Sequence, residues 1–270
     1  MDAAESTIPV GRAKLAAVVR SAGDVILTEH VAKELRVPRH RASKILARWT
    51  AQGWLRRVGP GAYVAASLDS LGKEHVLDDP WILVPALFDP AYIGGRTAAE
   101  YWDLTEQLFR DIVVITTQPV RKKAVLRHGA SFSLKHKDQA SLFGTKTVWR
   151  HQTKVQVSDV HRTIIDMLDD PALGGGIQHV TDCLSAYARR DDRDFNKLIN
   201  YAVRLGNGAV FKRLGFLAQH LEISDFPVEG CLAQLTAGKS KLDPALSCPR
   251  ISTKWRLWIP ESFVRKAIRD

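Results

Sequence analysis

Residues 35–64 read LRVPRHRASKILARWTAQGWLRRVGPGAYV. The stretch has a Val-Pro pair near its start, followed by apolar residues at helical spacing. Near its end, a Gly-Pro-Gly turn joins two short segments. Seven Arg or Lys residues and His40 lie between Arg36 and Arg57, and no Asp or Glu occurs from residue 35 to residue 68. A basic zone without acids favours contact with phosphate groups.

Two short helices are expected at the N-terminal side of this basic zone, and the second overlaps its first residues. In the first, apolar residues recur at i, i+3, i+4 and i+7 from Leu15 to Ala22. The second should begin near Thr28, whose hydroxyl can accept a hydrogen bond from a free backbone N–H as an N-cap. It should end at Val37, because a residue that precedes proline is pushed out of the α region.

A third helix is expected from Pro38 onward, with one apolar face and one basic face. The buried stripe should consist of Ala42, Ile45, Leu46 and Trp49. Because successive residues turn by about 100°, the opposite face should carry His40, Lys44, Ala47 and Arg48, flanked by Arg41 and Ser43. The basic side chains therefore point away from the core.

A β-hairpin should follow this helix. Gly53 is suited to end the helix, and residues 54–58 and 62–64 should pair across the Gly59-Pro60-Gly61 turn, with Arg56 and Arg57 at the hairpin base. This order of elements is that of a winged helix-turn-helix, whose second motif helix enters a DNA groove while the hairpin, or wing, lies on the backbone. A solvated helix face is the alternative explanation of the charge run taken alone.

The composition predicts the class of protein. A length of 270 residues suggests two domains, which we place at residues 1–70 and 71–270. The formal net charge of +10 favours a polyanionic partner, nucleic acid first. No N-terminal run resembles a signal peptide, and the apolar run at residues 80–88 is too short to span a membrane, so we expect a cytoplasmic protein. The three cysteines lack ligand spacing and are expected to be packing residues.

The second region should combine a central sheet with several helices. Strands are expected at residues 111–117, 131–134 and 147–157, and helices at 80–88, 97–104, 161–168, 180–187, 195–205 and 209–221. The tail, residues 222–270, is interrupted by prolines, with one strand expected at 255–259. The expected fold class is therefore α+β, a winged helix followed by a mixed α/β domain.

The middle of the second region is also basic. Between residues 112 and 158, nine Lys or Arg face one acid, Asp138. A basic sheet face can contact DNA beside the winged helix or an acidic partner, and solubilising surface charge is the alternative. The residues named as secondary contacts are Arg121, Lys122, Lys123 and Arg127.

An enzymatic role has little support in the sequence. The chain has no His-Glu-x-x-His or Gly-x-Ser-x-Gly motif, and Ser70 and Lys73 fit Ser-x-x-Lys only within a linker. Asp159 and His161, near a helix start, are better explained by capping and surface solvation than by acid–base chemistry. We therefore expect no catalytic residues, no metal site and no cofactor.

Several segments resemble one known family. They are GAYV at residues 61–64, YIGGRTAAEYWDLTEQ at 92–107, VVITT at 113–117, YAVRLGN at 201–207 and KRLGF at 212–216. Together they resemble the AbiEi-type antitoxins of type IV toxin-antitoxin systems, over about residues 12 to 221. The resemblance implies a winged helix that binds inverted repeats in its own promoter as a repressor, and a C-terminal domain that counteracts a nucleotidyltransferase-like toxin, AbiEii.

The resemblance also implies which residues contact DNA. These are Arg39, His40, Arg41, Ser43, Lys44, Arg48, Arg56 and Arg57. Two copies are expected on the inverted repeats, since one small winged helix makes few contacts. The alternative is a solitary transcriptional regulator whose C-terminal domain binds a protein or a small ligand, and a nucleic-acid enzyme is less favoured.

Overall fold

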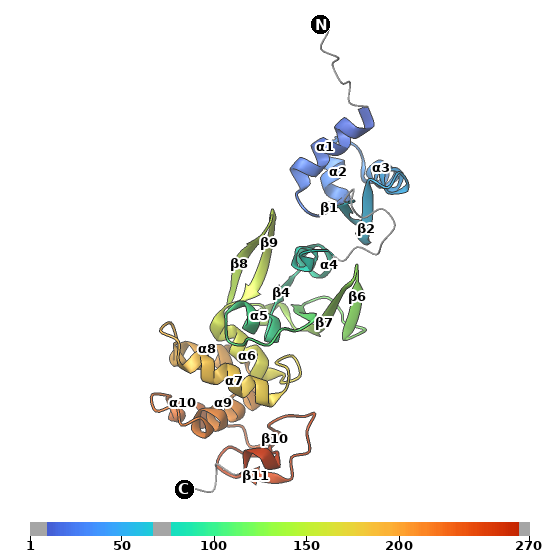
Figure 1. Cartoon of the computed structure of the whole chain (residues 1–270). Helices are drawn as coiled ribbons and strands as arrows, with labels where there is room; N and C mark the ends of the chain where they lie inside the picture. Colours follow the sequence, from blue (N-terminus) through green and yellow to red (C-terminus); the bar gives the residue numbers. More distant parts are fainter. Residues whose placement is uncertain (1–9, 67–76, 265–270) are drawn as a thin grey trace. The chain divides into compact units, whose positions relative to one another are not determined.

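The structure is a computed structural model that describes residues 10–66 and 77–264 (Figure 1). It contains both helices and mixed sheets, so the fold class is α+β, as expected. The chain divides into two compact units. The first unit comprises Met1–Asp89, Leu126–Ser131 and Thr147–Val155, and the second unit comprises Pro90–Val125, Phe132–Lys146 and Gln156–Asp270. The boundary expected at residue 70 and the Ser70-to-Lys73 motif lie outside the described residues.

The first unit begins with the elements of a winged helix. They are α1 (Val10–Ala22), β1 (Ile26–Leu27), α2 (Thr28–Glu34), α3 (Arg39–Ala51), β2 (Leu55–Gly59) and β3 (Ala62–Ala65). The three strands form an antiparallel sheet in the order β1-β3-β2. A short 3-10 turn (Pro80–Ile82) and α4 (Leu83–Phe88) complete the helical part of this unit and coincide with the helix expected at residues 80–88.

The apolar stripe of α3 lies in the core of the first unit, as predicted. Ala42, Leu46 and Trp49 are buried together with Val18 of α1, and Ile45 packs against them half-buried. Gly53 ends α3 in the left-handed conformation, with φ of +74°. The N–H of Trp54 then donates to the carbonyl of Trp49, 2.9 Å away. The expected helix and its terminator are both confirmed.

Two local expectations at α2 are wrong. Thr28 is not an N-cap, because β1 pairs with β3 up to Leu27 and the chain passes directly from strand to helix. The Thr28 hydroxyl instead donates to the carbonyl of Gly61 in the wing turn, at 3.2 Å. In addition, α2 ends at Glu34 rather than Val37, because Arg36 adopts φ of +50° and turns the chain early.

The second unit is built around a six-stranded sheet whose order is β6-β7-β5-β4-β9-β8. The strands are β4 (Ala91–Ile93), β5 (Asp111–Thr116), β6 (Ala124–Arg127), β7 (Ala130–His136), β8 (Thr145–Arg150) and β9 (Thr153–Ser158). Strand β4 is central, antiparallel to β5 and parallel to β9. The tips of the β6–β7 and β8–β9 hairpins belong to the first unit. The strands predicted at residues 111–117 and 131–134 are confirmed, and the extended segment predicted at 147–157 forms two strands, β8 and β9, joined by a turn at residues 151–152.

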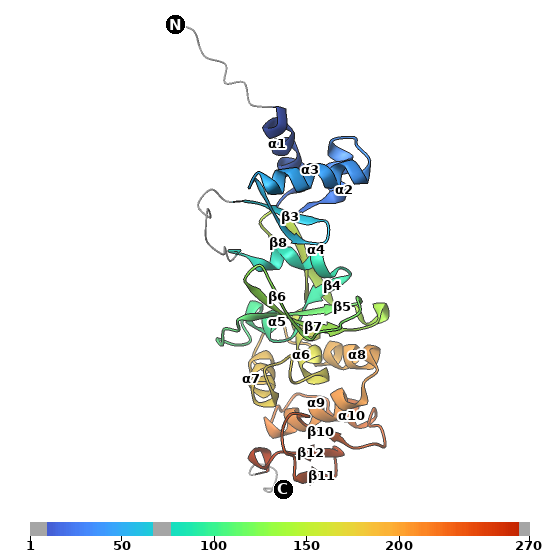
Figure 2. The same ribbon diagram turned by 90° about the vertical axis from the view of Figure 1, so that its right-hand side faces the viewer.

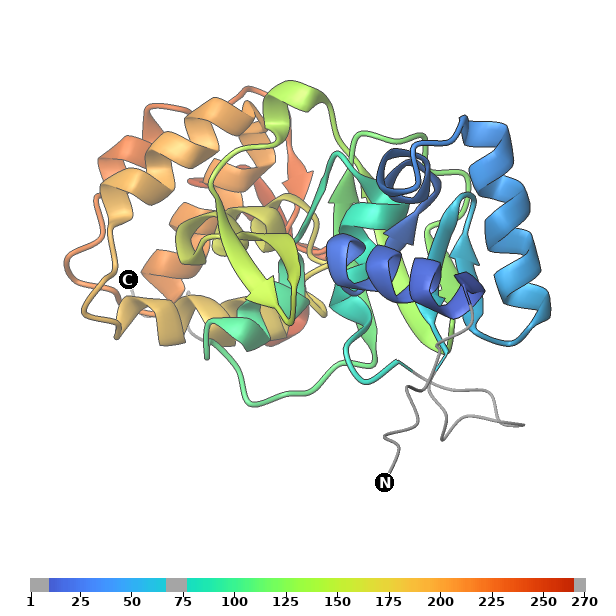
Figure 3. The same ribbon diagram turned by 90° about the horizontal axis from the view of Figure 1, so that it is seen from above.

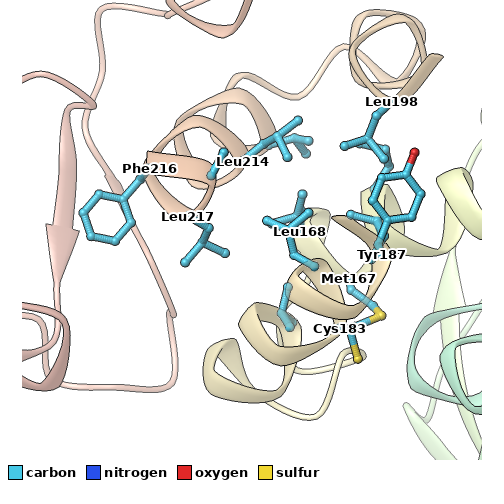
Figure 4. Close-up of a cluster of buried hydrophobic side chains, with 14 of the residues drawn as sticks. Met167, Leu168, Cys183, Tyr187, Leu198, Leu214, Phe216 and Leu217 are labelled. Carbon is cyan, nitrogen blue, oxygen red and sulfur yellow. The ribbon is translucent and has the colours of Figure 1, made fainter. Parts of the chain in front are cut away.

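Helices form the core of the second unit. They are α5 (Gly95–Tyr101), α6 (Val160–Asp169), α7 (Ile177–Ala188), α8 (Phe195–Leu205), α9 (Gly208–His220) and α10 (Val228–Leu232). Figures 1 and 2 show α6 to α9 between the large sheet and a smaller C-terminal sheet. Met167 and Leu168 of α6 face Cys183, Tyr187 and side chains of α8 and α9 (Figure 4).

The cysteines are free in the structure. Cys183 and Cys231 are buried in the helical core, which confirms their packing role, and Cys248 is half-buried. None of the helices formed by residues 10–66 and 77–264 is long and apolar enough to cross a membrane.

The tail forms a second, three-stranded sheet in the order β10-β12-β11. Its strands are β10 (Ser240–Lys241), β11 (Arg250–Ser252) and β12 (Leu257–Ile259), followed by a 3-10 turn (Glu261–Phe263). The strand expected at residues 255–259 is therefore shorter than predicted. Trp255 lies in a turn instead, buried against α9, and its indole N–H donates to Gln219 Oε1 at 2.9 Å.

Candidate nucleic-acid interface

Helix α3 presents its basic side chains to solvent. Pro38 takes the N-cap position in an extended conformation, and the N–H groups of Arg41 and Ala42 donate to its carbonyl at 2.9 and 3.1 Å. Opposite the buried stripe, the exposed residues are Arg39, His40, Arg41, Ser43, Lys44, Ala47 and Arg48. In Figures 1 and 3, α3 lies at the periphery of the first unit. The predicted division of α3 into two faces is confirmed.

Folding leaves most of these cations without carboxylate partners. Arg41, Lys44 and Arg48 make no ion pair with any residue in the described ranges 10–66 and 77–264. Arg39 lies 3.7 Å from Glu29 on α2, but both side chains are more than 70% exposed, at 74% and 71%. Such an exposed pair contributes little and is easily exchanged for a phosphate. The face therefore retains its positive charge for an external anion.

Ser43 differs from its neighbours because its hydroxyl is already engaged. It donates to the carbonyl of Arg39, one turn earlier in α3, at 3.1 Å. In this rotamer the Ser43 oxygen offers only acceptor capacity outward. Ser43 is therefore better suited to accept a hydrogen bond from a base edge than to contact a phosphate oxygen, which is itself an acceptor.

The wing is a β2–β3 hairpin with an irregular register. Arg57 pairs with Tyr63 and Gly59 with Ala62, which leaves a bulge between them. Arg57 is exposed, and its Nε donates to the Gly59 carbonyl at 3.1 Å. Arg56 is half-buried on the same strand. Both arginines lie on the wing as predicted, and Arg57 is the more accessible of the two.

Two further exposed cations of the first unit lie outside the set predicted from the sequence. Arg36 is exposed in the turn between α2 and α3 and has a left-handed backbone, which the sequence pattern does not indicate. Arg12 of α1 is exposed. Its guanidinium lies over the ring of Trp54, the residue just before β2, at 5.7 Å from the ring centroid. Because this contact joins distant parts of the sequence, no local signal could have revealed it.

The four secondary residues do not form one group. Arg121, Lys122 and Lys123 are exposed in the second unit, before β6, whereas Arg127 belongs to the first unit. There, the neighbouring His128 Nε2 lies 2.8 Å from the carbonyl of Val58 in the wing. Arg127 therefore belongs to the unit that contains the wing, next to a residue that contacts it.

The basic sheet face expected in the second region is partly neutralised. Lys135 pairs with Asp170 and Lys137 with Asp169, both at 2.7 Å. In the first unit, Arg150 pairs with Asp79 at 2.6 Å. The count of charged residues between positions 112 and 158 did not include these acids, because they lie elsewhere in the sequence. Three of the nine cations of this region are therefore already paired with carboxylates of the fold.

The Asp159 and His161 pair is structural. Asp159 caps α6 by accepting from the N–H of Arg162 at 2.8 Å, and it also accepts from the Tyr201 hydroxyl at 2.8 Å, which confirms the capping role. His161 is buried, so the expectation of surface solvation is wrong for it, and its Nδ1 lies 2.8 Å from the Tyr187 hydroxyl. Burial lowers the pKa of His161. Within residues 10–66 and 77–264, no group of three His, Cys, Asp or Glu could hold a metal ion.

Comparison with known proteins supports the fold alone. No protein-family model matches the chain. No curated protein matches it in sequence either. Among solved structures, the chain is similar to the crystal structure of the RV2827C protein from Mycobacterium tuberculosis, with a TM-score of 0.59 and 15% sequence identity. The match covers 93% of this chain and 91% of that one. The chain therefore has an α+β fold that occurs in a solved structure despite low sequence identity.

Proposed function

We propose that the chain binds duplex DNA upstream of its own gene through α3 and the wing, and represses that promoter. The observation that carries this proposal is the exposed face of α3, where Arg41, Lys44 and Arg48 lack carboxylate partners among the described residues. They are spaced i, i+3 and i+7, so they lie along one line of the helix. A protein that binds its own promoter would act in the cytoplasm.

The charge of this surface sets the expected salt dependence. Six cations, four on α3 and two on the wing, can each neutralise one phosphate. Each such contact lowers log affinity by about 0.9 per unit of log salt concentration, so a slope near −5 is expected for each bound copy. Each residue that hydrogen-bonds a base edge should contribute ~1–3 kcal/mol to the discrimination between the correct and a wrong base. Two copies on an inverted repeat would be spaced by one or two DNA turns.

The DNA proposal is tested with three α3 cations replaced together. The Arg41→Ala, Lys44→Ala, Arg48→Ala variant should lose specific binding to the upstream fragment, measured by fluorescence anisotropy at several salt concentrations. A matched control replaces three exposed lysines of the tail, Lys239, Lys241 and Lys254, by alanine, which changes the net charge equally. If both variants bind like wild type, or both lose binding to the same degree, α3 is not the recognition helix.

We further propose that the protein is the antitoxin of an AbiE-like type IV system. The resemblance of residues 12–221 to AbiEi-type antitoxins supports this, and the second unit is the part expected to counteract the toxin. The α3 triple variant should still rescue cells that express the nucleotidyltransferase-like toxin encoded beside it, while it no longer represses the promoter. The full chain is used because the first unit contains segments beyond residue 70. Failure of wild-type protein to rescue would favour the solitary regulator.

A further inference from the structure

A pocket of about 440 Å³ lies entirely within the second unit. Its walls come from the start of α5, the loop before β6, strand β7 and the loop after α6. The lining residues are Arg96, Val120, Lys123, Ser133, Leu134, Lys135, His136, Asp170, Ala172 and Leu173. This volume falls within the range of ~300–1,000 Å³ that is usual for small-molecule sites.

Arg96 forms a fixed cationic wall of this pocket. Its Nη1 donates to the carbonyl of Ala172 at 2.8 Å, its Nη2 donates to Asp111, and its side chain is only 12% exposed. The ring of Phe109 supports the guanidinium at 5.1 Å. Gly95, with φ of +56°, allows the backbone to approach the loop after α6, where the Arg96 N–H donates to the carbonyl of Leu173 at 2.9 Å. The wall is therefore held in place before any ligand binds.

The cations of the lining outnumber its carboxylates, although Arg96 is already paired with Asp111, which does not line the pocket. Its lining contains three cations, Arg96, Lys123 and Lys135, and one carboxylate, Asp170. Lys135 is already paired with Asp170 at 2.7 Å. Lys123 is exposed and has no ion-pair partner among residues 10–66 and 77–264. Lys123 is therefore the lining cation that is available to an incoming anion.

The uncharged part of the lining is mostly apolar, with Ser133 and His136 as its polar members. Val120, Leu134 and Leu173 contribute aliphatic side chains from three different segments. A pocket with apolar walls and few charged groups orients a ligand through its charge and binds it by burying its apolar part. An inorganic anion alone would leave these aliphatic walls without contact, and a metal cation would meet repulsion from the lysines.

We propose that this pocket binds a small organic anion. Its carboxylate or phosphate group would pair with Lys123 near Lys135, and its apolar body would lie against Val120, Leu134 and Leu173. The proposal does not depend on DNA binding, because all lining residues belong to the second unit. It assigns a site to the unit whose role the winged helix does not explain.

The test uses the full chain and titration calorimetry with four probes. The anionic probes are adenosine monophosphate and benzoate, the neutral counterpart is adenosine, and inorganic phosphate reports on charge alone. At least one organic anion should bind, more tightly than adenosine or phosphate. The Lys123→Ala variant should weaken that binding by about tenfold or more, because a charge-assisted hydrogen bond is lost.

Lys122→Ala is the matched control, since Lys122 is an exposed neighbour with the same charge that does not line the pocket. It should change the affinity by less than about twofold, as expected for a charge that is screened by solvent. Equal effects of the two substitutions would overturn the proposed position of the anion. Binding of adenosine or of phosphate as tight as that of the better organic anion, or no binding by either organic anion, would overturn the proposed ligand class.

Discussion

Replacing Gly215 by alanine is expected to destabilise the second unit, although a helix interior normally prefers alanine to glycine. Gly215 lies inside α9, where alanine is usually favoured over glycine by ~1 kcal/mol. A Cβ at this position, however, would lie 2.1 Å from two ring carbons of Trp255. Carbon atoms normally approach to about 3.5–4.0 Å, so the ring would have to move by more than about 1 Å.

The ring has little freedom to move. Trp255 is only 1% exposed, and its N–H donates to Gln219 on the next turn of α9. Overpacking of a filled core usually costs ~1–3 kcal/mol, sometimes more. Because the added Cβ would lie only 2.1 Å from two ring atoms, we take the upper part of this range, about 2–3 kcal/mol. After subtraction of ~1 kcal/mol for the helix preference, we expect Gly215→Ala to lower the free energy of unfolding by about 1–2 kcal/mol.

Urea denaturation followed by circular dichroism measures this change. Gly238→Ala is the control, since the residue is exposed and a Cβ added there would meet no neighbouring side chain within 4 Å. In a Trp255→Leu background, Gly215→Ala should cost less, because the smaller side chain leaves space. A Gly215→Ala protein as stable as wild type would refute the packing of Trp255 against α9.

Two further predictions concern the wing and a buried carboxylate. Arg57→Ala should reduce the magnitude of the salt slope of DNA binding by about 1 and should lower the affinity for all DNA sequences by the same factor. A change of base preference in this variant would instead mean that Arg57 reads a base edge. Burial raises the pKa of Asp166 from 3.8 to about 6, so the folded state binds more protons and stability should fall as pH rises from about 4 to about 6. Asp166→Asn should be less stable overall, because buried Arg162 loses its charged partner. The variant's stability should be flatter over that pH range in urea titrations, and an unchanged pH slope would contradict the assignment to Asp166.

Long elements with clear end signals can be predicted from the sequence. Helix α8 is predicted at residues 195–205 and is found there. Its apolar periodicity is bounded by Asp194, which caps the helix by accepting from the N–H of Lys197, and by Gly206, whose φ is +74°. Periodicity and both end signals agree, which is the condition under which local sequence determines local structure.

The small C-terminal sheet could not be predicted in the same way. Strands β10 and β11 have two and three residues, too few for an alternating pattern to be recognised. Strand β12 pairs with both, parallel to β10 and antiparallel to β11, so the sheet depends on contacts between separate segments. Local propensity carries little information about such pairing.

The candidate interface shows the same division between local and tertiary information. The face of α3 follows from residue spacing alone, and the structure confirms it. The Thr28 bond to Gly61 and the left-handed Arg36 depend on how β1 meets β3 and on a short interhelical turn. Neither has a signal in the spacing of apolar residues.

Charge counted along the sequence is a poor guide to charge available in the fold. Lys135 and Lys137 belong to a stretch with a single acid, yet Asp170 and Asp169, at the end of α6, pair with them. On α3 Arg39 forms an exposed ion pair with Glu29 at 3.7 Å, whereas Arg41, Lys44 and Arg48 have no ion-pair partner in the part of the chain that the structure describes. Binding of an external anion is favoured where folding leaves a cation unpaired, since no internal ion pair must first be broken. The α3 face and Lys123 meet this condition in different units, so their anions should bind independently, and the α3 triple variant should leave the affinity of the pocket unchanged.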